Sequence, residues 1–170
     1  DDVDAADYDL VFYPGGHGPM EDLAVNEVSG RILVDRMADN APVALLCHAP
    51  AAVLATENVS GGSPFAGRKM TGFSNDEEHA GGLADKAPWL LETRLREGGA
   101  SFSSGEAWSP HVVVDRTVYT GQNPASTAPL ADAAERLFGS GAGSFIAIGA
   151  VVSTIGTLNG FTLLSGQVPF

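Results

Sequence analysis

Residues 42–52 read PVALLCHAPAA, and this stretch decides the fold. Residues 42–46 carry no charge, as expected for a strand that is buried on both faces of an α/β sheet. Residues 51–55 are again apolar and follow a proline, which is tolerated in the first turn of a helix. The sequence therefore predicts a buried strand, a sharp turn at Cys47-His48, and a helix.

The segments on either side alternate between strand and helix. Upstream, residues 9–13 form a short β-prone run, and the apolar spacing within residues 22–40 is that of an amphipathic helix. Downstream we expect a strand at 68–71, a helix at 87–97, a tight hairpin that pairs 111–114 with 117–120, and a helix from 123 to about 138. Such alternation predicts a layered α/β domain.

Charge is unevenly distributed along the 170 residues. All 30 charged residues precede position 137, and the net charge is −12. This acidity argues against a nucleic-acid partner, because binding to a phosphate backbone needs a cationic patch. A single cysteine excludes an internal disulfide, and no secretory signal is visible, so we expect a cytoplasmic protein.

The uncharged end of the chain differs from the rest. Residues 139–143 resemble a flexible linker, and residues 145–164 have the length of a bilayer-spanning helix. Residues 147–169 resemble part of an amino-acid permease helix; the alternative is a soluble apolar helix or strand pair that caps the domain. We predict a domain over 1–138 and a foreign tail over 139–170, with membrane contact only through that tail.

Cys47 lies where the buried strand ends and the helix begins. The free amides and the positive end of a helix stabilise a thiolate, and such a turn projects the side chain outward as a nucleophile. The alternative is a small buried hydrophobe. The backbone amide of His48 could supply one oxyanion-hole donor, and the amide of Gly16, in a glycine loop at the end of the neighbouring strand, could supply the second.

Four motifs together carry a family resemblance. They are Tyr8–Met20 (YDLVFYPGGHGPM), Ala44–Ala52 (ALLCHAPAA), Met70–Glu78 (MTGFSNDEE) and Thr120–Ser126 (TGQNPAS). In this order they resemble the ThiJ/PfpI, class I glutamine-amidotransferase-like superfamily, in particular the heat-shock chaperones that act as glutathione-independent glyoxalases (glyoxalase III). The resemblance covers residues 8–138. It implies a flavodoxin-like three-layer sandwich with a mostly parallel sheet.

The resemblance implies roles for particular residues. Cys47 would be the nucleophile, His48 its catalytic partner, and Glu78 the carboxylate that orients the histidine, with Glu77 as the adjacent alternative. Without the family, both glutamates would be interpreted as part of a solvated helix start.

The resemblance also implies a substrate and a reaction. Gly15, His17 and Trp108 would line the substrate pocket, although Trp108 could equally be a core residue. The thiolate would attack a 2-oxoaldehyde such as methylglyoxal, and proton transfer and hydrolysis would release lactate. No metal or organic cofactor is required, and a homodimer is implied. Deglycase activity or a chaperone role is a related possibility in this branch.

The chain departs from the family at its beginning. Family members start with a strand, a helix and a second strand, which supply a central strand and a glutamate beside the cysteine. We therefore expect a domain that lacks this first strand-helix-strand unit and belongs to a fragment or a fusion. With unpaired strand edges and no such glutamate, it would be weakly active or inactive.

Other functions remain open from the sequence. A glutamine amidotransferase shares the fold and the nucleophile, but it carries a distant histidine with a carboxylate two residues later, and no histidine here has that partner. A PfpI-type cysteine peptidase is a second alternative. A non-catalytic stress chaperone or an inactive remnant is the third.

Overall fold

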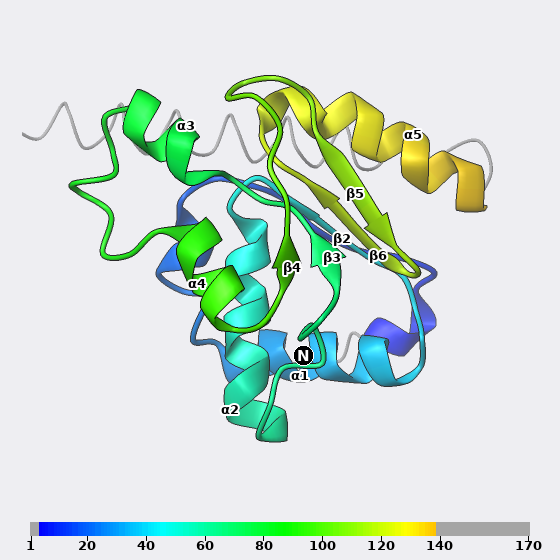
Figure 1. Cartoon of the computed structure of the whole chain (residues 1–170). Coiled ribbons are helices and arrows are strands. Elements are labelled where there is room, and N and C mark those ends of the chain that lie inside the picture. Colours follow the sequence, from blue (N-terminus) through cyan, green and yellow to red (C-terminus); the bar gives the residue numbers. More distant parts are fainter. Residues whose placement is uncertain (1–3, 139–170) are drawn as a thin grey trace, which may run out of the picture.

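The computed structural model describes residues 4–138, which form a four-stranded sheet with helices on both faces (Figure 1). The strands are β1 (Val11–Tyr13), β2 (Val43–Leu46), β5 (Val112–Asp115) and β6 (Val118–Gly121). Their order across the sheet is β1-β2-β6-β5. The first three are mutually parallel, and β5 runs antiparallel to β6. This confirms the predicted α/β fold with a mostly parallel sheet.

Strand β2 lies inside the sheet, between β1 and β6. All four of its residues are buried, which explains why this stretch carries neither charge nor alternation. Val43 is paired with Val118 and Leu46 with Gly121 in the neighbouring strand. The carboxyl ends of β2 and β6 therefore meet at one edge, where open α/β sheets place their ligands.

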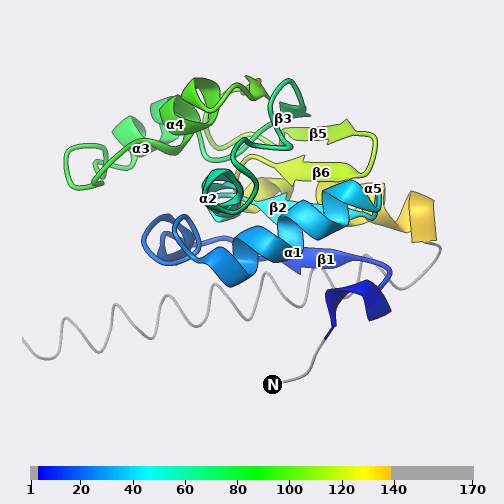
Figure 2. The same ribbon diagram turned by 90° about the horizontal axis from the view of Figure 1, so that it is seen from below.

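Helices cover the two faces of this sheet. Figure 2 shows α1 (Glu27–Ala38) and α2 (Thr56–Ser60) on one side and α5 (Thr127–Phe138) on the other. The 3-10 segment η3 (Ala49–Ala55) joins β2 to α2, and α5 packs against β5 and β6. The three layers match the predicted sandwich.

A smaller unit lies beside β5. It contains the two parallel strands β3 (Lys69–Met70) and β4 (Ser101–Phe102), the helices α3 (Asn75–Ala80) and α4 (Leu91–Glu97), and the loops that join them. Three short 3-10 turns complete the described elements: η1 (Ala5–Asp7), η2 (Gly18–Met20) and η4 (Pro124–Ser126). The backbone amide of Thr71, just after β3, donates to the hydroxyl of Thr120 on β6, which fixes this unit to the main sheet.

Arg36 on α1 ties the amino-terminal segment to the sheet. Its side chain is buried, and its guanidinium donates to the carbonyls of Ala5, Tyr8, Asp9 and Pro42. Hydrogen bonds from a buried cation are among the stronger ones in proteins. This arginine therefore fixes the segment that leads into β1, and all four acceptors are backbone carbonyl oxygens.

Several boundaries differ from those predicted. The helix after Cys47 starts as 3-10 and becomes α-helical only at Thr56, and the helix expected from residue 87 starts at Leu91, after an extended Leu90. The hairpin turn falls on Arg116-Thr117, one residue later than expected. Strand β4, which spans only two residues, was not predicted.

The predicted tail, residues 139–170, lies outside the described residues. Among residues 4–138, no helix combines the length and the apolar character that a membrane crossing requires.

Candidate active site

Cys47 occupies a strained turn at the end of β2. Its φ is 61°, in the left-handed region that costs a non-glycine residue about 1–3 kcal/mol and that clusters at functional sites. Its amide donates to the carbonyl of Gly121 at 2.8 Å, and its own carbonyl accepts from the amide of Phe73 at 2.8 Å. The end of β6 and the segment before α3 thus hold the turn that the sequence predicts.

His48 links the thiol to a carboxylate. Its Nδ1 lies 3.3 Å from the Sγ of Cys47, and its Nε2 lies 2.5 Å from Oε1 of Glu78. The ring packs against two others: its centroid is 3.9 Å from that of His17 and 4.3 Å from that of Phe73. The structure therefore brings Cys47, His48 and Glu78 together in the order that the resemblance implies for a catalytic triad.

Glu77 and Glu78 both lie on α3, whose first turn is capped by Ser74. Their exposed fractions are 0% and 1%, so the interpretation as a solvated helix start is wrong for both. Their neighbours Asp76 and His79 are exposed and do face solvent.

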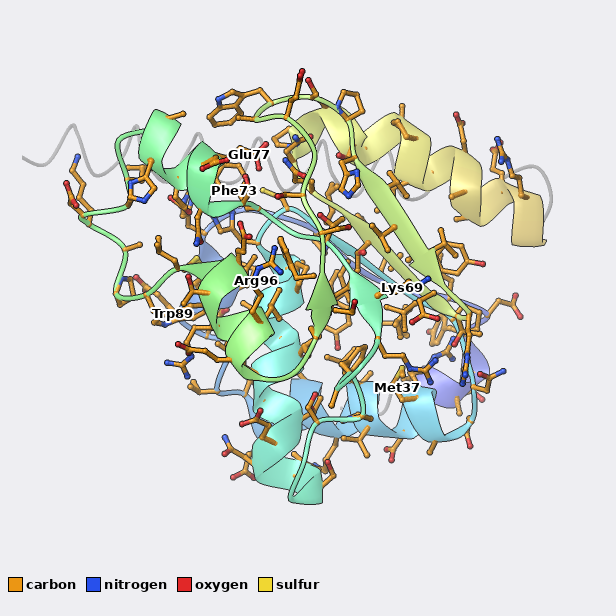
Figure 3. All side chains as sticks on the ribbon, viewed as in Figure 1. Met37, Lys69, Phe73, Glu77, Trp89 and Arg96 are labelled. Atoms are coloured by element: carbon orange, nitrogen blue, oxygen red, sulfur yellow. The ribbon has the colours of Figure 1, made fainter. Side chains whose placement is uncertain are left out.

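The two glutamates have different partners. Oε2 of Glu77 accepts from the amide and hydroxyl of Ser74, and its Oε1 accepts from the Trp108 amide and the Asn123 side chain. Figure 3 labels Glu77 on α3 and Phe73 on the segment that leads into this helix. Glu77 thus joins three loops around the site, whereas Glu78 is the carboxylate that contacts His48.

The glycine loop approaches the nucleophile closely. A Cβ added to Gly15 would lie 2.6 Å from the Cβ of Cys47, so no side chain fits there without a shift. Gly16 has a φ of 106°, which favours glycine. Its backbone amide and that of His48 both lie close enough to the Cys47 sulfur to lower the pKa of the thiol. These are the two amides that the sequence analysis proposes for the oxyanion hole.

A pocket of about 260 Å³ opens above the sulfur. The predicted residues Gly15, Gly16, His17, Cys47, His48 and Trp108 all line it, together with Leu46, Phe73, Glu77, Gly81, Leu83, Pro124 and Thr127. Trp108 is 51% exposed and packs edge-on against Phe73 at 5.5 Å, so the alternative of a core tryptophan is wrong. The small volume and aromatic walls suit a small, partly apolar molecule.

The sulfur rests as a thiol in this environment. Burial raises the pKa of Cys47 from 9.0 to about 12; the amides of Gly16 and His48 lower it by less, and the charges of Glu77 and Glu78 raise it further. This corrects the expectation of a stabilised thiolate: the amides do face the sulfur, but burial and the two carboxylates outweigh them. Any nucleophilic attack must therefore be coupled to removal of the thiol proton.

This pKa has a measurable consequence. At pH 8 with EDTA present, we expect iodoacetamide to alkylate Cys47 at least about a hundredfold more slowly in the folded chain than in urea, because the folded thiolate fraction is lower. The rate should keep rising with pH beyond 10. A rate that levels off below pH 7 would instead indicate a stable thiolate–imidazolium pair.

The same shift predicts the direction of a stability change. Between about pH 9 and 12 the unfolded chain has released the thiol proton, whereas the folded chain still binds it. The contribution of Cys47 to the free energy of unfolding therefore decreases as pH rises through this window.

The pKa shifts of His48 and Glu78 favour a neutral imidazole beside an ionised carboxylate. Burial lowers the pKa of His48, partly offset by the hydrogen bond to Glu78. Burial alone would raise the pKa of Glu78, but the hydrogen bond from His48 and the electrostatic attraction of the two imidazoles hold it below its ordinary value. The resting site is thus a neutral thiol, a neutral imidazole that can accept a proton, and an ionised carboxylate.

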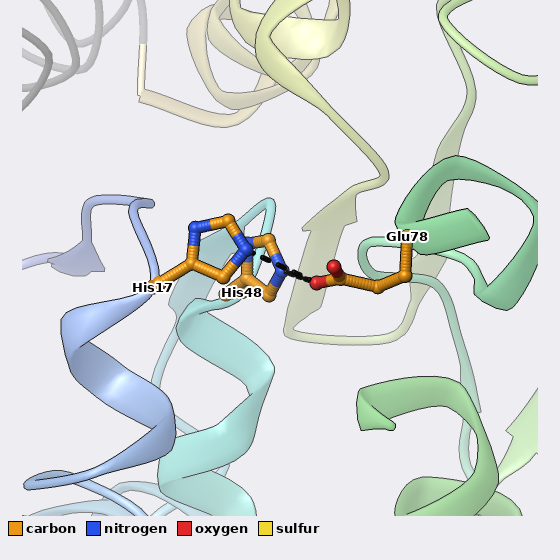
Figure 4. A group of neighbouring side chains, drawn as sticks. All are labelled: His17, His48 and Glu78. Atoms are coloured by element: carbon orange, nitrogen blue, oxygen red, sulfur yellow. Dashed lines mark hydrogen bonds and ion pairs between the residues drawn. The ribbon is translucent and has the colours of Figure 1, made fainter. Parts of the chain in front are cut away.

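His17 adds a second imidazole to this group. Its Nε2 lies 3.1 Å from the same Oε1 of Glu78, its side chain is 43% exposed, and it lines the pocket. Figure 4 shows both imidazoles directed at the one carboxylate. One potential ligand atom from each of His17, His48 and Glu78 lies within 4.8 Å of the other two, so these residues could hold a metal ion.

The sequence did not predict the site contacts of three further residues. Phe73, which stacks on His48, was named only within a family motif, and Asn123 only within a family motif and as the start of a helix. Glu77 was seen only as an alternative to Glu78. One signal was present: Ser74 followed three residues later by Glu77 is the pattern of a capping box, which forms here.

Comparison with known proteins is consistent with this geometry. Residues 1–134 match the DJ-1/PfpI family. The chain is 34% identical over 128 residues to the human glutamine amidotransferase-like class 1 domain-containing protein 1, covering 75% of this chain and 58% of that protein. It is 29% identical over 137 residues to glyoxalase 3 of Candida albicans, covering 77% of this chain and 58% of that protein.

A solved structure is similar as well. The rapid encystment protein of 24 kDa from Francisella tularensis superimposes with a TM-score of 0.75 at 36% sequence identity, covering 79% of this chain and 60% of that one. The chain thus spans 58% of the length of the curated relatives described above.

Proposed function

Because this chain belongs to the DJ-1/PfpI family, we propose that its reaction is that of a glutathione-independent glyoxalase, which converts a small 2-oxoaldehyde such as methylglyoxal to the 2-hydroxy acid. The observation that carries the proposal is the hydrogen-bonded series from Cys47 through His48 to Glu78 at the base of a small pocket. A relative of this chain carries the name glyoxalase 3.

The geometry supports a definite first step. Nδ1 of His48 accepts the proton of the Cys47 thiol as the sulfur attacks the aldehyde carbon, and Glu78 stabilises the imidazolium that forms. The amides of Gly16 and His48 stabilise the developing oxyanion, which the imidazolium then protonates to give a hemithioacetal.

The later steps use the same imidazole. Neutral His48 removes the hydrogen from the aldehyde carbon, and the resulting enediol is reprotonated on the neighbouring carbon, which leaves a thioester on Cys47. Water, deprotonated by His48, then hydrolyses the thioester, so that the aldehyde and one water become one 2-hydroxy acid and the thiol is restored. Gly15, His17 and Trp108 would contact the substrate in the pocket.

This mechanism can be tested with the substrate itself. In the absence of glutathione we expect the protein to convert methylglyoxal to lactate, followed by proton NMR. In deuterated water the product should carry deuterium at C2, because the base exchanges its proton with solvent. Lactate formation no faster than in buffer would contradict the proposal, and retention of the original hydrogen at C2 would contradict the base-mediated step.

One rival is weakened by the position of the imidazole. A glutamine amidotransferase would use a distant histidine, whereas the imidazole at the thiol here belongs to the adjacent His48. Release of ammonia from glutamine would reverse this preference. The homodimer and the cytoplasmic location stay predictions.

A further inference from the structure

We propose that His17, His48 and Glu78 form a binding site for a Zn²⁺ ion, and that occupation of this site switches off the thiol chemistry. Nε2 of each histidine contacts Oε1 of Glu78, at 3.1 Å from His17 and 2.5 Å from His48. Two imidazole nitrogens and a carboxylate oxygen are a donor set that zinc accepts, with a fourth position left for water.

The spacing of these atoms is close to that of a zinc site. Zinc bonds of about 2.0–2.1 Å in a tetrahedron place ligand atoms about 3.3 Å apart. The three candidate atoms lie within 4.8 Å of one another, so changes of about 1 Å in side-chain position bring them to that geometry. His17 is half-exposed, so a hydrated ion can reach the group from the pocket.

Glu78 also has a second carboxylate oxygen that could coordinate a metal ion. Its side chain is 1% exposed, and in the part of the chain described here its Oε2 has no hydrogen-bond partner. Both oxygens of the adjacent Glu77, by contrast, accept hydrogen bonds. A buried carboxylate oxygen without a partner is costly unless something else contacts it, and a metal ion would do so.

The charges around the group favour a cation. Glu77 lines the pocket and Glu78 contacts His48, which also lines it, whereas no Lys or Arg is among the residues that line the pocket in the described chain. A divalent ion would therefore enter a site of net negative charge.

Zinc on Nε2 would disable the proton acceptor. A neutral imidazole that holds a metal on Nε2 keeps its proton on Nδ1, and Nδ1 of His48 is the atom that faces the Cys47 sulfur. His48 could then no longer accept the thiol proton. This inhibitory consequence rests on the proposed function, but metal binding does not.

Binding can be measured without activity. Metal-free protein is titrated with Zn²⁺ against a chromogenic chelator, and we expect one ion per chain. His17→Gln retains a hydrogen-bond donor to Glu78 but removes a ligand, and it should weaken binding at least about tenfold. Cys47→Ser and the matched control His79→Ala, an exposed histidine next to Glu78, should bind within about threefold of the unchanged chain.

Two results would overturn the site. One is unchanged affinity in His17→Gln, and the other is loss of binding in Cys47→Ser, which would make the sulfur a ligand. Co²⁺ provides an independent test. We expect the visible d–d bands of bound Co²⁺ without the intense ultraviolet band of a thiolate ligand. Appearance of the thiolate band would contradict the proposal.

Inhibition is then tested on methylglyoxal turnover. Zn²⁺ should stop turnover near the concentration at which it binds, and EDTA should restore it, with His79→Ala unchanged in sensitivity. Full turnover by zinc-loaded protein would refute the switch. A protein that binds zinc but has no turnover at all would instead refute the proposed function and leave the metal site standing.

Discussion

Replacing Cys47 by Ser is expected to reduce methylglyoxal turnover to the rate measured without protein, a loss of at least about two orders of magnitude. The reason is chemical: the alcohol occupies the same place beside His48 and the Gly16 amide, but an alkoxide is far harder to form than a thiolate. The measurement is lactate production under substrate saturation, for the variant and the unchanged chain at equal concentration.

The control for this variant is its stability. Ser is close in size to Cys and keeps the positive φ, so the free energy of unfolding in urea should change by less than about 1.5 kcal/mol. A folded Ser variant that still forms lactate at the original rate would exclude covalent catalysis at this position. If Cys47→Ser loses both turnover and folding, Cys47→Ala is tested instead, and the same loss of turnover is expected for it.

Replacing Glu77 by Ala is expected to have the largest effect on stability, about 3 kcal/mol or more. The change removes the acceptor of four hydrogen bonds and leaves buried donors on Ser74, Asn123 and the Trp108 backbone without a partner. Burial alone would raise the pKa of Glu77, but these donors hold it below its ordinary value, so the ionised form is the one that binds the loops. Urea unfolding monitored by tryptophan fluorescence measures the loss.

The neighbouring residue provides a matched control. Asp76 lies on the same turn of α3 but is exposed, so Asp76→Ala should cost no more than about 1 kcal/mol. The loss in the free energy of unfolding for Glu77→Gln should lie between those for Glu77→Ala and Asp76→Ala. The amide retains one carbonyl oxygen as an acceptor, but its NH₂ group faces other hydrogen-bond donors. Equal losses in the two alanine variants would show that Glu77 does not hold the loops together.

The elements that the sequence predicted well are those with a strong local pattern. Residues 42–46 carry no charge, which predicts a strand buried on both faces. The apolar spacing near residue 30 predicts the helix there, and the turn near residue 116 predicts the hairpin. The ends were less certain, as at Leu91, where the helix starts only after an extended Leu90.

The site was predictable only where it follows the chain. Cys47 and His48 are adjacent, and the glycine loop follows a strand whose end must lie nearby. Burial of Glu77 and Glu78 was hidden, because acidic residues between exposed neighbours have the pattern of a solvated helix start. Their partners His17 and Asn123 are far along the chain, and only tertiary packing brings these groups together.

The hydrogen bond from the Cys47 amide to Gly121 also bears on protein synthesis. Strand β2, which ends just before Cys47, leaves the ribosome about 70 residues before β6, which at roughly 5–20 residues per second is several seconds earlier. Throughout that interval β2 has no partner on the β6 side, so we expect Cys47 to be more solvated, and its thiol more acidic, than in the folded protein. The nascent chain therefore presents a more easily ionised thiol to cellular aldehydes and oxidants than the finished protein does.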